Sequence, residues 1–262
     1  TPTRYVYLEQ LQLTTVEALA AASPHRLSDL PGFGPHVAQK LVRQAQATHT
    51  QQAMLTFDAV QHLPPSAGEI DRLLPMESVE LYFDIEAAPE RELIYLHGVL
   101  VVDRQSQTET FHALLAEQPD GEESIWHQFL QIAHQYPDAP IFHFCPYELQ
   151  TVKKLAHAYN TPLEIVQPLL ERFVDVHERT VQLTALPIES YALKAIARWV
   201  GFDWRDEGAN GAQSIYWYDQ WLETGDRTFI DTILRYNEDD CRATWRVKDW
   251  LVEFLQAQYP PR

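Results

Sequence analysis

The chain has 262 residues, 45% of them hydrophobic and 11% aromatic, which suffices for one large domain with a real core, or for a large domain and a small one. Charged residues interrupt every apolar stretch before it reaches the roughly 18 residues that a membrane-spanning helix needs, and we expect no signal peptide. The net charge of −17 excludes strong non-specific attraction to phosphates, although residues 1–68 are balanced, with four basic and four acidic residues.

Residues 1–68 are predicted to form a small helical domain. Val16 to Ala22 is rich in Ala and Leu, and Thr15 is a suitable N-cap for a helix there. Ser23 followed by Pro24 is a typical helix start. Another helix is predicted after Pro35, because apolar side chains recur on one stripe. These side chains are Val37, Ala38, Leu41, Val42 and Ala45.

The turn between the last two of these helices contains two glycines. Residues 23–47, with Leu30-Pro31-Gly32-Phe33-Gly34-Pro35 at their centre, resemble a helix-hairpin-helix motif. The resemblance implies that the glycines let the backbone approach a phosphate, which amides at the start of the second helix then bind. The alternative is a plain helical hairpin that packs against the following domain. The candidate nucleic-acid-binding residues are Gly32, Phe33, Gly34, Lys40 and Arg43.

A break in the pattern falls near residues 62–78, where the stretch 63–68 (Leu-Pro-Pro-Ser-Ala-Gly) indicates a loop. We therefore expect domains at 1–68 and 69–262. Strands are predicted at 79–86, 93–102 and 109–115, and their short connections favour an antiparallel meander. A helix at 122–135, a strand at 139–144 and a helix at 147–159 are predicted to follow.

The final hundred residues are predicted to be mostly helical. Ser190 is expected to cap a helix that ends near Val200, with Gly201 as its stop, and residues 226–257 to form one long helix or two. Strands first, then strands alternating with helices, predict an α/β fold with a mixed sheet flanked by helices. The aromatic group of Tyr216, Trp217, Tyr218 and Trp221 is interpreted as core, with stacking on bases as the alternative.

Three acidic clusters lie far apart in the sequence. Asp84 and Glu86 are two residues apart on a predicted strand, so both side chains point to the same face. Hard divalent cations need several carboxylate oxygens that converge on one point, and two such ions are a common device for hydrolysing phosphodiesters. Taken alone, the pair equally suits a strand end whose acids face solvent.

The other two clusters lie at predicted helices. Tyr236 and Asp240 are four residues apart and share one helix face, whereas Asp239 points away and is the weaker candidate. The alternative for this cluster is a solvated acidic face. Glu148 lies in the first turn of its helix, where an acidic side chain also complements the helix dipole, so it has a structural interpretation as well.

In combination, the motifs Phe83-Asp84-Ile85-Glu86 and Tyr236 followed by Asp240 resemble the first and third motifs of a known exonuclease superfamily. Residues 78–255 resemble the RNase H-like exonuclease domain of the DEDD (DnaQ-like) superfamily, most closely the YprB type found in bacterial RecB-like nucleases. The segment 190–196 resembles a helix that these domains also contain. The resemblance implies an RNase H-like fold and removal of nucleotides from the 3′ end of a single strand.

One motif departs from the family pattern. The second motif usually presents an aspartate after an aromatic residue, whereas Tyr147 is followed here by Glu148, whose reach is longer. Asp175 is a further candidate acid and is ranked below Glu148, and His143 is interpreted as a structural histidine near the site. The predicted catalytic set is Asp84, Glu86, Glu148, Tyr236 and Asp240.

The ligand set predicts two Mg²⁺ or Mn²⁺ ions as cofactors. Asp84 is expected to bridge both ions, Glu86 and Asp240 to hold the one that activates water, and Glu148 to hold the other. Tyr236 is expected to position the water. An exonuclease fold that binds nucleic acid without cutting it is the main rival hypothesis. A scaffold domain whose acids are merely solvated is the second.

The expected partner is nucleic acid, single-stranded DNA or 3′ ends in particular, with RNA also open. Since the sequence opens on Thr1 and not on Met, we expect a piece of a longer RecB-like nuclease that contains a further nuclease domain, with a processed chain as the alternative. The two cysteines, Cys145 and Cys241, form no CxxC pair, which argues against a disulfide framework or a structural zinc. This cysteine usage favours a cytoplasmic location, and no membrane association is expected.

Overall fold

The computed structural model describes residues 2–62 and 67–258. The chain divides into two compact units, of which one combines Thr1–Glu69 with Arg179–Tyr191 and the other combines Ile70–Glu178 with Ala192–Arg262. The segment Arg179–Tyr191 joins the first unit, although the sequence placed it in the second domain. The domain limits 1–68 and 69–262 therefore remain a proposal. Of the predicted loop 63–68, residues 63–66 lie outside the described residues, and helix α6 (Ala67–Leu73) begins where a loop was expected.

The first unit is built from short helices around a small apolar core. Thr15 accepts a hydrogen bond of 3.2 Å from the Ala18 amide, which confirms it as an N-cap. The core consists of Leu27, Ala38 and Val42. The helices are α1 (Pro2–Gln10), α2 (Val16–Ala20), α3 (Pro24–Ser28), α4 (Gly34–Thr50) and α5 (Phe57–His62). An antiparallel pair of short strands, β1 (Met54–Leu55) and β7 (Thr184–Ala185), was not predicted.

The second unit contains a five-stranded mixed sheet, in the order β4-β3-β2-β5-β6. The first three strands form the predicted antiparallel meander, and the last two run parallel to β2. The strands are β2 (Val79–Ala88), β3 (Leu93–Asp103), β4 (Thr108–Leu115), β5 (Ile141–His143) and β6 (Phe173–Asp175). The prediction of an α/β fold with a mixed sheet is confirmed.

Helices surround this sheet. They are α7 (Glu122–Gln135), α8 (Tyr147–Ala158), α9 (Leu163–Glu171), α10 (Val176–Leu183), α11 (Leu193–Trp199), α12 (Gly211–Thr224) and α13 (Arg227–Gln258), with short 3₁₀ helices η1 (Pro89–Arg91) and η2 (Pro119–Gly121). The predicted segment 226–257 is thus one helix. Among the described helices, none has both the length and the apolar character needed to cross a membrane.

The predicted cap of one helix was wrong. Helix α11 has Ala192 as its N-cap, two residues after Ser190. The hydroxyl of the neighbouring Tyr191 accepts a hydrogen bond from the Leu186 amide and contacts Gln44 Oε1, so the residue after Ser190 is held within the first unit. The predicted stop was right, since Gly201 follows the helix with a φ of +86°.

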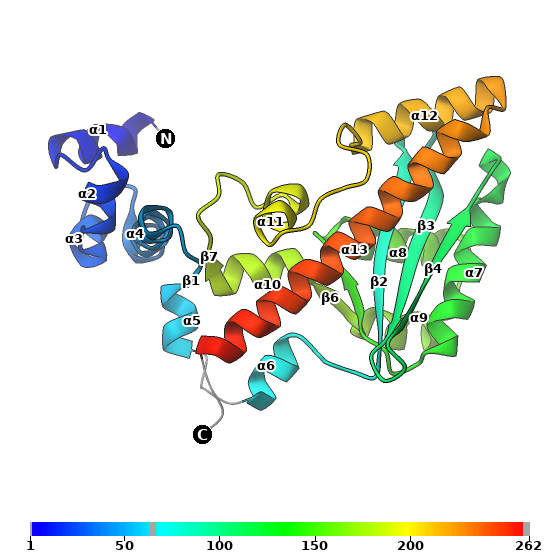
Figure 1. Cartoon of the computed structure of the whole chain (residues 1–262), viewed down its shortest axis with the longest axis horizontal. Helices are drawn as coiled ribbons and strands as arrows, with labels where there is room; N and C mark the ends of the chain where they lie inside the picture. The colour runs from blue at the N-terminus through cyan, green and yellow to red at the C-terminus, as the bar shows by residue number, and fades with distance from the viewer. Residues whose placement is uncertain (1, 63–66, 259–262) are drawn as a thin grey trace. The chain divides into compact units, whose positions relative to one another are not determined.

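Strand β2 divides its side chains between two faces of the sheet. On one face, Phe83 stacks on Phe129 of α7, with ring centroids 4.5 Å apart. On the other face, alternate polar side chains meet helix α13, which crosses the sheet (Figure 1). Tyr218 of α12 is fully buried and stacks on Tyr95, so the aromatic group of this helix is mainly core, apart from Tyr216, which is 56% exposed.

A buried ion pair attaches α13 to β2. Lys248 Nζ lies 2.6 Å from Glu80 Oε1, and both side chains are almost completely buried. Glu80 also accepts hydrogen bonds from Arg104 and from the hydroxyl of Tyr82. Because Glu80 precedes Asp84 by four residues on the strand, this cluster holds the helix against the same face that presents Asp84.

We expect Lys248→Met to destabilise the protein by about 3 kcal/mol, because removing one partner leaves a buried charge incompletely compensated. Urea unfolding followed by circular dichroism measures the change. The control is Glu117→Gln, which breaks the exposed pair with Arg227 and should cost less than about 1 kcal/mol. Equal effects of the two substitutions would contradict this role for Lys248.

Candidate metal centre

Three of the predicted carboxylates converge in the second unit. Asp84 and Glu86 come from β2 and Asp240 from α13, and one oxygen atom from each lies within 4.8 Å of the others. The strand alternation places the two β2 acids on the face that α13 covers, and the helix brings Asp240 to them. The structure thus assembles three hard oxygen ligands from two segments that are about 150 residues apart in the sequence.

The cluster lies in a buried environment that disfavours negative charge. Burial, reinforced by the charge of Asp240, raises the pKa of Glu86 from 4.5 to about 8. Burial raises the pKa of Asp240 from 3.8 to about 7, against the hydrogen bonds from Trp204 and Tyr236. The pKa of Asp84 is raised well above its ordinary value by burial and by the three neighbouring carboxylates. A divalent cation would relieve this repulsion, so the donor set fits one.

Tyr236 lies one helical turn before Asp240 and is 8% exposed. Burial and the neighbouring acids, Asp240 first among them, raise the pKa of its phenol far above the ordinary value of 10.0. The hydroxyl therefore keeps its proton at neutral pH and acts as a hydrogen-bond donor or positioner, not as a base.

Glu148 is buried at the start of α8, 5% exposed, and its charge acts on Asp84 and Glu86. Burial raises the pKa of Glu148, and His143 opposes this effect. His143 Nδ1 lies 2.7 Å from the carbonyl oxygen of Cys145 but 3.5 Å from Glu148 Oε2, so its proton goes to the carbonyl. Glu148 Oε2 is buried and has no hydrogen-bond partner among the described residues. A carboxylate oxygen in this situation fits the role of a metal ligand.

Asp175 has a structural role in this arrangement. At the end of β6, its Oδ1 accepts hydrogen bonds of 3.1 Å from the amides of Cys145 and Glu178. The first of these fixes the turn before Glu148, where Cys145 has a left-handed φ of +77°. The second caps the start of α10. Asp175 thus holds the backbone beside the site.

The predicted nucleic-acid-binding residues lie in the first unit. Gly32 and Gly34 have φ values of +82° and +62°, a conformation that favours glycine, and Lys40 is exposed. Phe33 is buried, and Arg43 stacks over the Phe57 ring at 4.1 Å. The structure therefore leaves Gly32 and Lys40 exposed, with the Gly32 carbonyl accepting a hydrogen bond of 2.8 Å from Arg4 Nε, and uses Phe33 and Arg43 in packing.

Comparison with known families agrees with this geometry. The family described as RNase_H superfamily matches residues 81–252, which hold the whole carboxylate cluster. The chain belongs to the RNase_H superfamily. Members of this superfamily are typically phosphodiesterases that process nucleic acids and use divalent metals. A second family, described as a SAM-like helix-hairpin-helix tandem, matches residues 7–47 and shows such a module at the N-terminus. No curated protein and no solved structure matches the chain significantly.

Sequence reasoning missed three side chains that touch the acids of this RNase H-like centre. Trp204 Nε1 donates a hydrogen bond of 2.7 Å to Asp240 Oδ1, and Asn237 Nδ2 donates one of 2.7 Å to Asp84 Oδ2. Ser214, whose hydroxyl pairs with that of Tyr95, lowers the pKa of Glu86. Asn237 follows Tyr236 directly, so the helix period could have revealed it. Trp204 comes from a loop and Ser214 from α12, and no spacing in the sequence predicts that either residue lies near these acids.

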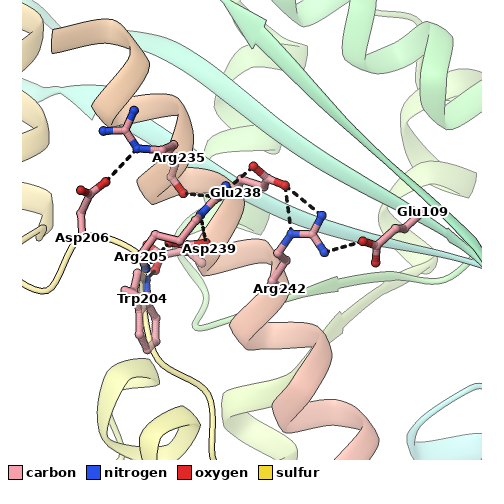
Figure 2. A network of polar contacts seen from close by, with 9 residues as sticks. Glu109, Trp204, Arg205, Asp206, Arg235, Glu238, Asp239 and Arg242 are labelled. Carbon is pink, nitrogen blue, oxygen red and sulfur yellow. Dashed lines mark hydrogen bonds and ion pairs between the residues drawn. The ribbon is translucent and has the colours of Figure 1, made fainter. Parts of the chain in front are cut away.

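A network of arginines holds the Trp204 loop beside α13 (Figure 2). Arg205 pairs with Glu238 and Asp239 at 2.8 Å each, and Arg235 pairs with Asp206 at 3.0 Å. Asp239, the weaker ligand candidate, is thus engaged by Arg205 on the side of α13 away from the metal ligands. The network fixes the loop directly after Trp204 and so supports its contact with Asp240.

The raised pKa values predict how the stability of the metal-free protein depends on pH. The folded state binds protons at Glu86 and Asp240 more tightly than the unfolded chain, so this contribution is complete below pH 3.8–4.5 and is lost as the pH rises to 7–8. In EDTA, we expect the melting temperature to fall over this range. Glu86→Gln should reduce the fall, and Mn²⁺ should restore stability at pH 8.

The control is Glu164→Gln, which changes an exposed glutamate in the first turn of α9. It should leave the pH profile as it is in the parent. Identical profiles for the parent and Glu86→Gln would contradict the coupling of Glu86 to the other acids.

Proposed function

We propose that the chain is a metal-dependent 3′-5′ exonuclease that hydrolyses single-stranded DNA, with RNA as a possible second substrate. The observation that carries the proposal is the convergence of Asp84, Glu86 and Asp240, with ligand oxygens within 4.8 Å of one another and Tyr236 beside them. The polarity rests on the motif resemblance, in which the tyrosine precedes the aspartate by four residues. The same motifs support assignment to the YprB type of RecB-like nucleases.

Each residue of the cluster has a separate role in the proposed two-metal hydrolysis. Two Mg²⁺ or Mn²⁺ ions, when bound, supply an activated water and stabilise the leaving 3′ oxygen. The charges of the three other acids all act on Asp84, which would be a ligand of both ions, while Glu86 and Asp240 would hold one of them. Tyr236 keeps its phenol proton and would orient the attacking water by hydrogen bonding.

The second ion depends on Glu148. Its unpaired Oε2 is the only hydrogen-bond-free carboxylate oxygen among the buried side-chain atoms of the described residues, which supports a ligand role. The glutamate side chain is longer than the aspartate typical of the second motif, so the spacing of the two ions can differ from the family pattern. A weakly cutting or non-cutting nucleic-acid-binding module is the alternative that this departure favours.

The helix-hairpin-helix module would contribute binding rather than chemistry. Its glycine turn would offer backbone amides to a phosphate, and Lys40 would add a sequence-independent charge contact. The balanced charge of residues 1–68 makes this module a better partner for phosphates than the acidic remainder of the chain. We further infer a cytoplasmic location from the cysteine usage and a further nuclease domain in the full-length protein from the RecB-like resemblance.

Asp84→Ala should lower the rate of cleavage by about 100-fold or more, because the metals contribute several kcal/mol of transition-state stabilisation. The assay follows 5′-labelled single-stranded DNA and RNA with Mn²⁺, and the expected products shorten stepwise from the 3′ end. Asp120→Ala, at an exposed position in η2, is the control. Cleavage by Asp84→Ala at the parent rate would contradict the proposal, and binding without cleavage by the parent would favour the alternative.

Tyr236→Phe should lower kcat by about 100-fold and leave KM and Mn²⁺ affinity nearly unchanged, because it removes only the hydroxyl that orients water. Steady-state kinetics on the same oligonucleotide measure the two constants. The matched control is Tyr216→Phe, since Tyr216 lies exposed on α12. A kcat within twofold of the parent value would exclude this role for the Tyr236 hydroxyl.

A further inference from the structure

Asn237 is fully buried on α13, between the two ends of the tyrosine–aspartate motif. Its Nδ2 donates a hydrogen bond of 2.7 Å to Asp84 Oδ2, and the same side chain lowers the pKa of Glu86 against the effect of burial. Asn237 therefore acts on both carboxylates of β2, through a hydrogen bond at Asp84 and through the pKa at Glu86.

The opposite end of this amide lacks a partner. Asn237 Oδ1 is buried and accepts no hydrogen bond from any described residue. Buried acceptors of this kind are uncommon because their desolvation is not compensated. Turning the amide over would not help, because it would place the oxygen against the carboxylate of Asp84. The orientation seen gives Asp84 its hydrogen bond and leaves the carbonyl oxygen without a partner among the described residues.

Gly98 provides the space for that oxygen. On β3 it is the cross-strand neighbour of Asp84, so both positions face α13. A Cβ atom at residue 98 would overlap Asn237 Oδ1, and it would lie 2.8 Å from Asn237 Cγ and 3.1 Å from Phe111 Cε2. The backbone of Gly98 has no left-handed φ, so what this position requires is the absence of a side chain.

We propose that Asn237, seated in the slot that Gly98 leaves, is a positioning residue of the metal centre. It holds Asp84 and Glu86 in the orientation that leaves their remaining oxygens free to meet Asp240 at an ion. This inference rests on the proposed metal-dependent function and adds a residue that the catalytic set lacks. Asn237 touches the ligands and acts through them, as outer-shell partners of metal ligands do.

The test measures Mn²⁺ binding directly, by electron paramagnetic resonance of free Mn²⁺. Asn237→Ala should bind Mn²⁺ about 10- to 100-fold more weakly than the parent. With the p-nitrophenyl ester of thymidine 5′-monophosphate as substrate, its activity should recover as Mn²⁺ is raised, while KM for the ester stays near the parent value. Gln128→Ala, at an exposed position of α7, is the control and should bind Mn²⁺ as the parent does.

A double-mutant cycle tests the slot. Gly98→Ala should weaken Mn²⁺ binding as Asn237→Ala does, because it displaces the amide. The double variant should lose no more than Asn237→Ala alone, since the two changes act through one contact. If Gly98→Ala does not fold, folding of the double variant supports the slot, because only the collision with Asn237 is then removed.

The outcomes separate this inference from the function on which it rests. Mn²⁺ binding by the parent that Asp84→Ala abolishes supports the metal centre whatever Asn237 does. Parent-like Mn²⁺ affinity in Asn237→Ala would overturn the positioning role alone, and additive losses in the double variant would overturn the slot. Absence of Mn²⁺ binding and of cleavage in the parent would overturn the metal centre and this inference together.

Discussion

The burial of several carboxylates side by side is the constraint on which the second unit depends. Asp84, Glu86 and Asp240 are brought close to one another in a position where Glu86 and Asp240 are buried and Asp84 is half-buried, so that like charges repel. Protons, N–H donors or a cation must balance this charge. Trp204 and Asn237 supply donors to two of the acids, and the raised pKa values show that these donors balance only part of the charge.

Such a cluster can persist only if the strand and the helix that carry it are held together elsewhere. The buried pair of Lys248 and Glu80 does this two helical turns beyond Asp240, on the same face of the sheet. On the outer side of α13, Arg205 binds Glu238 and Asp239 and holds the loop whose Trp204 reaches Asp240. Favourable contacts on both sides of the helix thus offset the unfavourable one at the metal centre. A cation would then complete the site without moving the backbone.

The sequence predicted the features that follow from the periodicity of a single strand or helix. The two-residue spacing of Asp84 and Glu86 and the four-residue spacing of Tyr236 and Asp240 each place both members of a pair on one face, and the structure has them so. Trp204 could not be found in this way, because it reaches Asp240 from a loop with no spacing of its own. Ser190 looked like a helix cap, but the helix starts at Leu193, after Tyr191, whose hydroxyl contacts Leu186 and Gln44.

A crystal structure with Mn²⁺ and thymidine 5′-monophosphate, phased to locate anomalous scatterers, tests the central claim most directly. We predict an anomalous peak coordinated by Asp84 and Glu86, with Asp240 as a ligand to the same site, and a second peak toward Glu148. An ordered site with no anomalous peak between these carboxylates, in crystals that contain Mn²⁺, would contradict it.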